Sequence, residues 1–409
     1  MAALFCKFSN SKRIKMSPMN QTDAKISGKC DPKFFWVREV FENLFEEGKE
    51  LGAGVAVSID GKLVVDLWGG YADTERARCW EKDTLVNVYS TTKGMTAACV
   101  HRLVDQGKLD PDRKVSRYWP EFGCNGKEDI RLRHLLSHQA GLPAIDAPLP
   151  PEAIFDWGTM TGALAEQAPL WKPGTQHGYH ARTFGWLLGE VVRRISGKSL
   201  GAYFKDEIAG PLGLDFYIGL PDEHHARVAA ITAVPPPPPG TEPNLARVMQ
   251  IRPQSFTARA FMNPPSYRIR DVANTPQWRR AELPSSNGHG TANAVARFYG
   301  ALACKGTIDG IRVLGPESIE CARTEQARGP DQVLIVETRF GHGFMMPVAG
   351  AEMGPNDKAF GHPGMGGSLG FADPEAGVGF GYVMNLAGSF ILIDERPIAL
   401  VTALYDCLG

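Results

Sequence analysis

The sequence predicts an α+β fold: an antiparallel sheet flanked by helices and built from both termini, with a second, mainly helical lobe. Near the N-terminus, the β-rich segments 54–59 and 62–68 surround an Asp-Gly pair, which is typical of a tight hairpin. Near the C-terminus, the strand-like segments 369–372 and 378–385 flank a second turn. Between these two regions apolar residues recur mainly with helical spacing.

The N-terminal region combines a polar segment with two predicted helices. Residues 1–31 are polar and basic, and we expect them to form a flexible lead. Apolar side chains recur every three or four positions over residues 34–47, which predicts a helix there. A second, buried helix is predicted over residues 91–106, and Gly107 provides its left-handed end.

The rest of the chain continues this pattern. Other predicted elements, in chain order, are helices over 133–141, 184–195, 200–209, 291–302 and 397–407 and a strand over 340–346. The stretch 221–284 contains a run of five prolines and reads as irregular. Segments of this length usually form a lid or a binding wall, or stay disordered.

These elements predict a division of the chain into domains. After the lead, residues 32–115 and 285–409 are expected to form the sheet domain. Residues 116–284 are expected to form the helical domain, with 221–284 as an insert that shapes a pocket.

Composition and charge exclude several classes of protein. The chain has 44 basic and 45 acidic residues, and outside the first thirty residues it shows no basic stripe of the kind that a nucleic-acid-binding protein has. No apolar run is long enough to span a membrane, and no export signal is evident. The eight cysteines form no close clusters, which indicates free thiols in a reducing compartment. We therefore expect a cytoplasmic protein with no nucleic-acid partner.

Ser90 and Lys93 form a Ser-x-x-Lys motif where the helix over 91–106 is predicted to begin. This spacing is almost one helical turn, so the hydroxyl and the amine share a face. A serine hydroxyl is a weak nucleophile at neutral pH, but a lysine can take its proton if burial lowers the pKa of the amine. The alternative is that Ser90 only caps the helix and Lys93 is a solvated charge. A second copy of the motif, Ser9 to Lys12, lies in the polar lead with no helix after it.

Two other motifs are interpreted as structural. Ser368 lies at the centre of a Gly-x-Ser-x-Gly pattern, which in one class of hydrolases needs a strand before the serine and a helix after it. Here the residues after Ser368 read as strand and turn, and no histidine follows His362. His134 and His138 lie one helical turn apart, but no third ligand is evident, so packing or capping is favoured over zinc binding.

Three motifs resemble, in order and spacing, those of serine β-lactamases and penicillin-binding proteins: Ser90-x-x-Lys93, Tyr179 and the glycine-rich segment 361–367. The resemblance covers about residues 35–405 and is strongest to family VIII carboxylesterases, a group related to class C β-lactamases. It implies that Ser90 is the acylated nucleophile and that Lys93 and Tyr179 relay its proton. Which of the two accepts the proton first is left open. A nearby cation is expected to lower the pKa of Tyr179.

The same resemblance implies further site residues. The N–H groups of Ser90 and Met365 would form an oxyanion hole, and the substrate-binding residues would be His362, Gly364 and Gly366. Two positions depart from the β-lactamase pattern. Ala181 stands where the Tyr-x-Asn motif has its asparagine, and His362 replaces the lysine of the third motif. Both departures favour uncharged esters.

The sequence therefore predicts a serine carboxylesterase that hydrolyses short-chain acyl esters through an acyl-enzyme, with weak β-lactam hydrolysis, of cephalosporins above all, as a side activity. A small-molecule ester is the expected partner, and no metal or organic cofactor is expected. The alternatives are a true class C-type β-lactamase or D,D-peptidase, an acyltransferase, and a catalytically silent binding protein. Natural substrate, acyl chain length, stereopreference and oligomeric state are left open.

Overall fold

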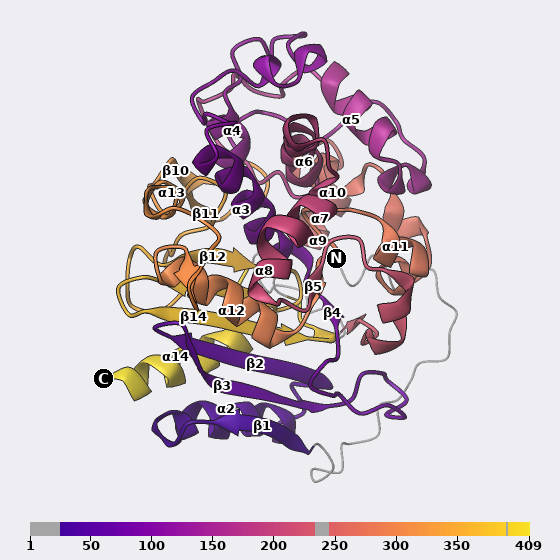
Figure 1. Cartoon of the computed structure of the whole chain (residues 1–409). Coiled ribbons are helices and arrows are strands. Elements are labelled where there is room, and N and C mark those ends of the chain that lie inside the picture. The colour runs from indigo at the N-terminus through magenta and orange to yellow at the C-terminus, as the bar shows by residue number, and fades with distance from the viewer. Residues whose placement is uncertain (1–24, 234–244, 390–391) are drawn as a thin grey trace.

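A six-stranded antiparallel sheet, in the order β1-β3-β2-β14-β13-β12, crosses one half of the computed structural model, which describes residues 25–233, 245–389 and 392–409 (Figure 1). Its strands are β1 (Ile26–Cys30), β2 (Gly52–Ile59), β3 (Lys62–Gly70), β12 (Phe360–Pro363), β13 (Leu369–Asp373) and β14 (Val378–Met384). The N-terminal and C-terminal strands meet where β2 pairs with β14, with Ile59 opposite Val378. The prediction of a sheet built from both termini is confirmed.

The hairpin between β2 and β3 turns at Asp60 and Gly61. Their φ angles are 48° and 78°, so both residues are left-handed, as the two-residue turns of β-hairpins require. The Asp-Gly pair therefore marked this hairpin correctly.

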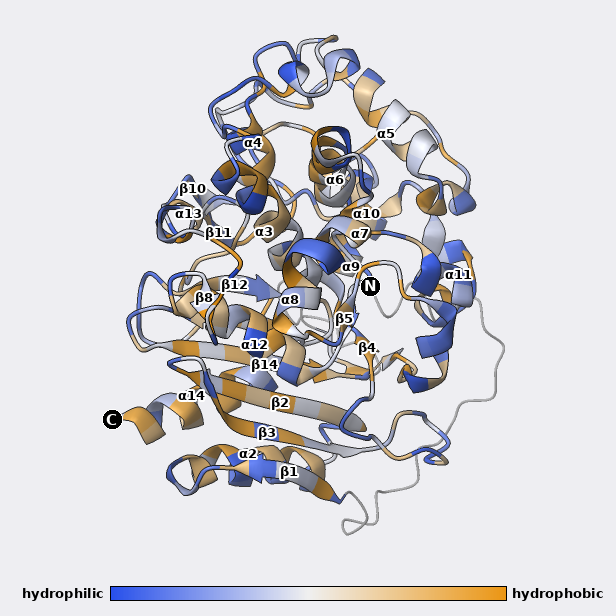
Figure 2. Ribbon diagram, viewed as in Figure 1, coloured by the Kyte–Doolittle hydropathy of each residue, from blue (hydrophilic) through white to orange (hydrophobic). Residues whose placement is uncertain are grey.

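Helices cover both faces of the sheet. The helices are α2 (Phe35–Glu46), α3 (Thr92–Asp105), α4 (Leu132–Leu136), α5 (Trp157–Glu166), α6 (Thr183–Ser196), α7 (Leu200–Phe204), α8 (Gly210–Leu212), α9 (Leu245–Ile251), α10 (Phe256–Met262), α11 (Pro276–Arg280), α12 (Ala292–Ala303), α13 (Pro316–Ala322) and α14 (Glu395–Leu408). Side chains of β2 alternate between two hydrophobic clusters: Val55 and Val57 lie with α2 and α14, whereas Ala56 lies with α12. The central strands are consequently apolar on both faces. Figure 2 shows β2 with orange, hydrophobic segments along its length.

Short strand pairs complete the fold. They are β4 (Val86–Asn87), β7 (His289–Gly290) and β5 (Phe216–Tyr217) in one small sheet, and the pairs β6 (Thr232–Ala233) with β15 (Leu386–Ala387), β8 (Thr307–Ile308) with β9 (Ile311–Arg312), and β10 (Ala327–Pro330) with β11 (Glu337–Phe340). Because β4 leads directly to Ser90, the small sheet ties the region of the predicted nucleophile to segments of the chain more than one hundred residues away.

The helical lobe and the sheet share one core along α3. This helix packs against α6 and α7, and its apolar side chains belong to the same cluster as those of α12. The predicted sheet domain (residues 32–115 and 285–409) and helical domain (residues 116–284) stay a prediction. Helix α3 lies where these two parts of the chain meet (Figure 1).

Three expectations differ from the structure. Residues 26–30 of the expected lead form β1, because their backbone pairs with β3; residues 1–24 lie outside the described residues. The irregular stretch 221–284 contains α9, α10 and α11, which are too short to show a clear helical period, and its proline run also lies outside the described residues. The strand expected over 340–346 is reduced to the end of β11 and a bridge between Phe340 and Met345.

Within the three described ranges, the structure has no helix of the length and apolarity needed to cross a bilayer.

The contact between α12 and β14 depends on glycine. A Cβ on Gly381 would lie 2.4 Å from the carbonyl oxygen of Ala292 and 2.6 Å from the backbone nitrogen of Ala296. Neither backbone atom can move without displacing α12, so the sheet and the helix can pack this closely only while position 381 has no side chain.

We predict that Gly381→Ala lowers the free energy of unfolding by about 1–3 kcal/mol, because the added methyl overpacks this contact. Gly162→Ala is the matched control: position 162 lies within α5, and a Cβ there meets no atom within 4 Å. The control should raise stability by about 0.5–1 kcal/mol through the helix preference of alanine. Urea denaturation of both variants measures the difference, and equal stabilities would contradict this account.

Candidate active site

Ser90 lies in a 3-10 turn, Tyr89–Thr91, that leads directly into α3. Tyr89 has a φ of 45°, which turns the chain sharply between β4 and the helix. Ser90 is half-buried and lines a pocket. Its backbone N–H points from the N-terminal end of a helical segment, where the helix dipole favours negative charge.

The amine of Lys93 is completely buried, and three oxygen atoms surround it. Its Nζ lies 3.1 Å from Ser90 Oγ, 2.8 Å from the carbonyl oxygen of Ala181 and 3.0 Å from that of Ser285. Burial lowers the pKa of Lys93 well below its ordinary value, because the ammonium form loses its hydration. The alternative of a solvated charge at Lys93 is therefore excluded.

Tyr179 reaches the same two groups from the loop before α6 (Thr183–Ser196). Its hydroxyl forms a hydrogen bond with the Ser90 side chain, and Lys93 Nζ lies 4.7 Å from the centre of its ring. The expectation that a cation would lower the pKa of Tyr179 is wrong. Burial raises this pKa well above 10, and the hydrogen bond to Ser90 opposes the rise only in part.

Two residues that sequence analysis missed hold Tyr179 in place. The buried carboxylate of Asp331 accepts a hydrogen bond of 3.0 Å from the Tyr179 backbone N–H. Phe340 stacks on the Tyr179 ring with a centroid separation of 6.4 Å. Asp331 stands far from Tyr179 in the sequence and belongs to no recognisable motif, so only its contacts reveal it.

The segment after β12 (Phe360–Pro363) forms a glycine loop, residues 364–367, beside the nucleophile. A Cβ on Gly364 would lie 2.2 Å from the carbonyl oxygen of Val88 and 2.1 Å from Ser368 Oγ, so only glycine fits against the turn that carries Ser90. Met365 lines the same pocket as Ser90. Gly364 and Gly366, predicted to bind substrate, are not among the residues that line this pocket.

The pocket at Ser90 is an open hollow with about 370 Å³ of free space, part of which is continuous with solvent, and its lining is mostly apolar. Its lining consists of Ser90, Tyr179, Phe261, Leu334, Met345, His362, Pro363, Met365 and Leu392. Burial, with the nearby Lys93, lowers the pKa of His362 to about 3, so its imidazole is neutral at physiological pH. His362 Nδ1 lies 2.7 Å from the carbonyl oxygen of Pro363, which requires the proton on Nδ1. Its buried Nε2 is then an acceptor without a partner in the described part of the chain.

Ser368 has a structural role, as its sequence context indicated. It precedes β13 (Leu369–Asp373) and no helix follows. Its hydroxyl donates to the carbonyl oxygen of Val88 at 2.8 Å and lies 3.1 Å from Thr91 Oγ1. Ser368 therefore links the glycine loop to the turn that carries Ser90.

The two histidines of the 133–141 segment also have structural contacts. His134 Nδ1 accepts the Arg131 backbone N–H at 3.2 Å, and His138 Nδ1 accepts the His180 backbone N–H at 3.0 Å. His138 also packs its ring 5.0 Å from that of Tyr179. These contacts agree with the predicted capping and packing roles.

Comparisons with known proteins agree on one family. The model of the Beta-lactamase family matches residues 37–403. The esterase/beta-lactamase LipL of Mycobacterium tuberculosis is 37% identical over 378 residues, which cover 91% of this chain and 86% of LipL. A crystal structure of a family VIII carboxylesterase is 41% identical, with a TM-score of 0.86 and coverage of 94% of this chain and 100% of that one. A penicillin-binding protein homologue from Caulobacter crescentus is 43% identical, with the same TM-score and coverage.

The geometry predicts which serine reacts. A fluorophosphonate probe should label Ser90, because a neutral amine can take its proton, and should not label Ser368, whose buried hydroxyl bonds to Val88 and Thr91. Mass spectrometry of the labelled protein locates the adduct. Ser90→Ala should abolish labelling and Ser368→Ala should retain it; an adduct on residue 368 would contradict the assignment.

Proposed function

This chain belongs to the beta-lactamase family, and we propose that it is a serine carboxylesterase that hydrolyses short-chain acyl esters through an acyl-enzyme on Ser90. The observation that carries this proposal is the buried amine of Lys93, which lies 3.1 Å from the Oγ atom of Ser90, a residue that lines an apolar pocket. The similarity to an esterase/beta-lactamase and to a family VIII carboxylesterase supports the same reaction.

Lys93 is the group that accepts the first proton. A neutral amine has two N–H bonds and one lone pair, and the carbonyl oxygens of Ala181 and Ser285 take the two N–H bonds. The lone pair then faces the hydroxyl of Ser90, which donates to it. As the Oγ–carbon bond to the ester forms, the proton moves from Ser90 to Lys93.

Tyr179 acts as the acid for the leaving group. Its raised pKa keeps the phenol protonated, and its hydroxyl is hydrogen-bonded to Ser90, close to the ester oxygen that departs. When the carbon–oxygen bond of the ester breaks, the alkoxide takes the phenol proton and Lys93 returns the serine proton to Tyr179. Water then attacks the acyl-enzyme by the reverse sequence and releases the acid.

The negative oxygen of the tetrahedral intermediate needs fixed donors. Ser90 N–H lies at the start of a helical segment, and the N–H of Met365 on the glycine loop is the second donor. Loss of one such donor typically costs about 100- to 1000-fold in turnover.

The lining of the pocket selects uncharged substrates. Six of its side chains are apolar, and no arginine or lysine is among the described residues that line it. His362 is neutral and presents an acceptor, which repels a carboxylate and suits a hydroxyl or N–H donor. A β-lactam carries a carboxylate that family members with a lysine at this position can pair. We therefore propose ester hydrolysis as the main activity and β-lactam hydrolysis, cephalosporins above all, as a weak one.

A true β-lactamase or D,D-peptidase is the second candidate, favoured by the likeness to a penicillin-binding protein homologue. It requires a nitrocefin turnover comparable to that of the best ester.

We predict that the wild type hydrolyses p-nitrophenyl butyrate far faster than nitrocefin, and that Ser90→Ala loses at least about a thousandfold in kcat/KM for both. Parallel assays of the two substrates with the wild type, Ser90→Ala and the control Ser368→Ala measure this. Equal rates in Ser90→Ala and the wild type would refute the esterase proposal. Nitrocefin turnover equal to ester turnover would favour the second candidate.

The pH profile should report Lys93. Only its neutral form accepts a proton, so kcat/KM should fall as the pH drops through the lowered pKa of Lys93. At high pH the rate should stay level until the raised pKa of Tyr179 is reached. Lys93→Arg, which stays charged at every accessible pH, should be inactive throughout.

Tyr179→Phe tests, in the same assay, whether Tyr179 is the acid for the leaving group while Lys93 is the base. It should lose about 100-fold or more with alkyl esters, whose alkoxide must be protonated, and much less with p-nitrophenyl esters, whose leaving group is stable as an anion. An equal loss with both esters would assign Tyr179 a different role.

A further inference from the structure

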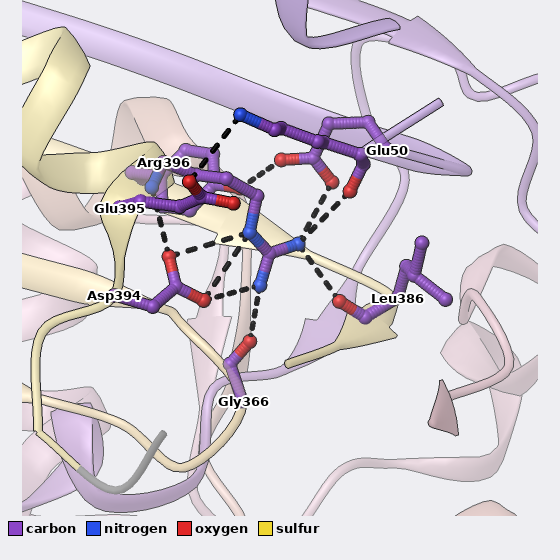
Figure 3. Close-up of polar contacts among 8 residues, drawn as sticks. Glu50, Gly366, Leu386, Asp394, Glu395 and Arg396 are labelled. Atoms are coloured by element: carbon purple, nitrogen blue, oxygen red, sulfur yellow. Dashed lines mark hydrogen bonds and ion pairs between the residues drawn. The ribbon is translucent and has the colours of Figure 1, made fainter. Parts of the chain in front are cut away.

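A buried cation lies behind the glycine loop, residues 364–367. The carbonyl oxygen of Gly366 accepts hydrogen bonds from Arg396 Nη2 at 2.6 Å and from the backbone N–H of Gly388 at 2.8 Å. Figure 3 shows the guanidinium of Arg396 between this carbonyl and two acidic residues. Gly366 directly follows Met365, whose N–H is the proposed second oxyanion donor.

Arg396 is itself held in a single orientation. It is 4% exposed, at the start of α14 (Glu395–Leu408). Its Nη2 lies 2.6 Å from Asp394 Oδ2, and its Nη1 lies 2.9 Å from the Leu386 carbonyl oxygen and 3.2 Å from Glu50 Oε2. Since the guanidinium is planar, these partners on three sides leave it no other position.

The charges around Arg396 make Asp394 its main counter-ion. Burial raises the pKa of Glu50 to about 7, so this carboxyl is only partly ionised at neutral pH. Glu50 also accepts a hydrogen bond from the hydroxyl of Tyr382. The amine of Lys49 faces outward to Glu47 and Glu395, while the Lys49 carbonyl oxygen accepts a hydrogen bond of 3.4 Å from Arg396 Nη1.

The glycine loop needs external support. Gly366 and Gly367 have φ angles of 90° and 126°, a region that side chains disfavour, and glycine has the largest conformational freedom to lose. An oxyanion donor works only when it is held close to its productive position before the reaction begins. The hydrogen bonds to the Gly366 carbonyl oxygen fix the Gly366–Gly367 peptide group, in the part of the loop directly after the donor residue Met365.

We propose that Arg396 is a positioning residue for catalysis, which holds the glycine loop so that Met365 N–H faces the oxyanion. This rests on the proposed function, because it requires Met365 to be an oxyanion donor. Stability alone does not account for such a residue, since buried ion pairs can often be replaced by apolar side chains without loss of stability.

Arg396→Lys tests the proposal, because it keeps the positive charge and loses the planar fork. Arg339→Lys is the matched control: Arg339 is 7% exposed and pairs with Glu325 and Asp357, each at 2.7 Å, but has no bond to the glycine loop. The measurements are kcat and KM for p-nitrophenyl butyrate, thermal unfolding, and inhibition by butylboronic acid. The boronic acid forms a tetrahedral adduct on serine, with one oxygen in the position of the oxyanion.

We expect Arg396→Lys to lower kcat at least about tenfold, with KM nearly unchanged, and to weaken inhibition by the boronic acid by a similar factor. Arg339→Lys should keep both values even where its melting temperature falls. Wild-type kcat and inhibition in Arg396→Lys would overturn the proposal. So would a loss of kcat with unchanged inhibition, which marks a merely structural role.

A second variant keeps the test decisive if Arg396→Lys does not fold. Asp394→Asn retains the N-cap of α14, because asparagine caps as well as aspartate, but removes the main counter-ion of Arg396. It should show the same paired loss of kcat and inhibition, to a smaller extent, and wild-type values would overturn the proposal.

Ser90→Ala separates a failure of the proposed function from a failure of this inference. Activity in that variant refutes the proposed function and this inference together. An inactive Ser90→Ala beside an unaffected Arg396→Lys refutes this inference alone.

Discussion

The contact between the buried amine of Lys93 and the hydroxyl of Ser90 is the interaction on which the rest of the site depends. An amine enclosed in this way is a base only because the protein removes water from it and still satisfies its N–H groups. The two carbonyl oxygens that do so belong to Ala181, in the loop before α6, and to Ser285, between α11 and β7. The lobe must therefore be folded against α3 before Lys93 can function.

A second support comes from the other end of the chain. The glycine loop reaches the nucleophile because Gly364 has no side chain and because Ser368 bonds to Val88. Behind the loop, Arg396 at the start of the C-terminal helix donates hydrogen bonds to the Gly366 carbonyl oxygen and to Glu50, which lies two residues before the sheet strand β2. The site thus lies between the helical lobe, which packs around the amine of Lys93, and the sheet, which supports the glycine loop with the proposed oxyanion donor Met365. An enzyme built this way can change its substrate through the pocket lining while the proton relay stays the same.

The pocket explains why the departures from the β-lactamase pattern matter physically. Replacing a lysine by His362 removes a positive charge and, in this buried setting, leaves an acceptor, because burial and Lys93 keep the imidazole neutral. The sequence predicted the loss of the cation but not the tautomer. It also predicted a lowered pKa for Tyr179, and the structure reverses the sign, since loss of hydration outweighs the hydrogen bond to Ser90.

What the sequence determined by itself was local. The Asp60-Gly61 turn, the helix that begins beside Ser90 and the order of the three motifs follow from residue types and spacing, because these depend on neighbours a few positions apart. Asp331 behind Tyr179, Arg396 behind Gly366 and the direction of each pKa shift were decided only by the tertiary structure. Those features depend on burial and on contacts between residues that are distant in the chain, and no spacing rule encodes them.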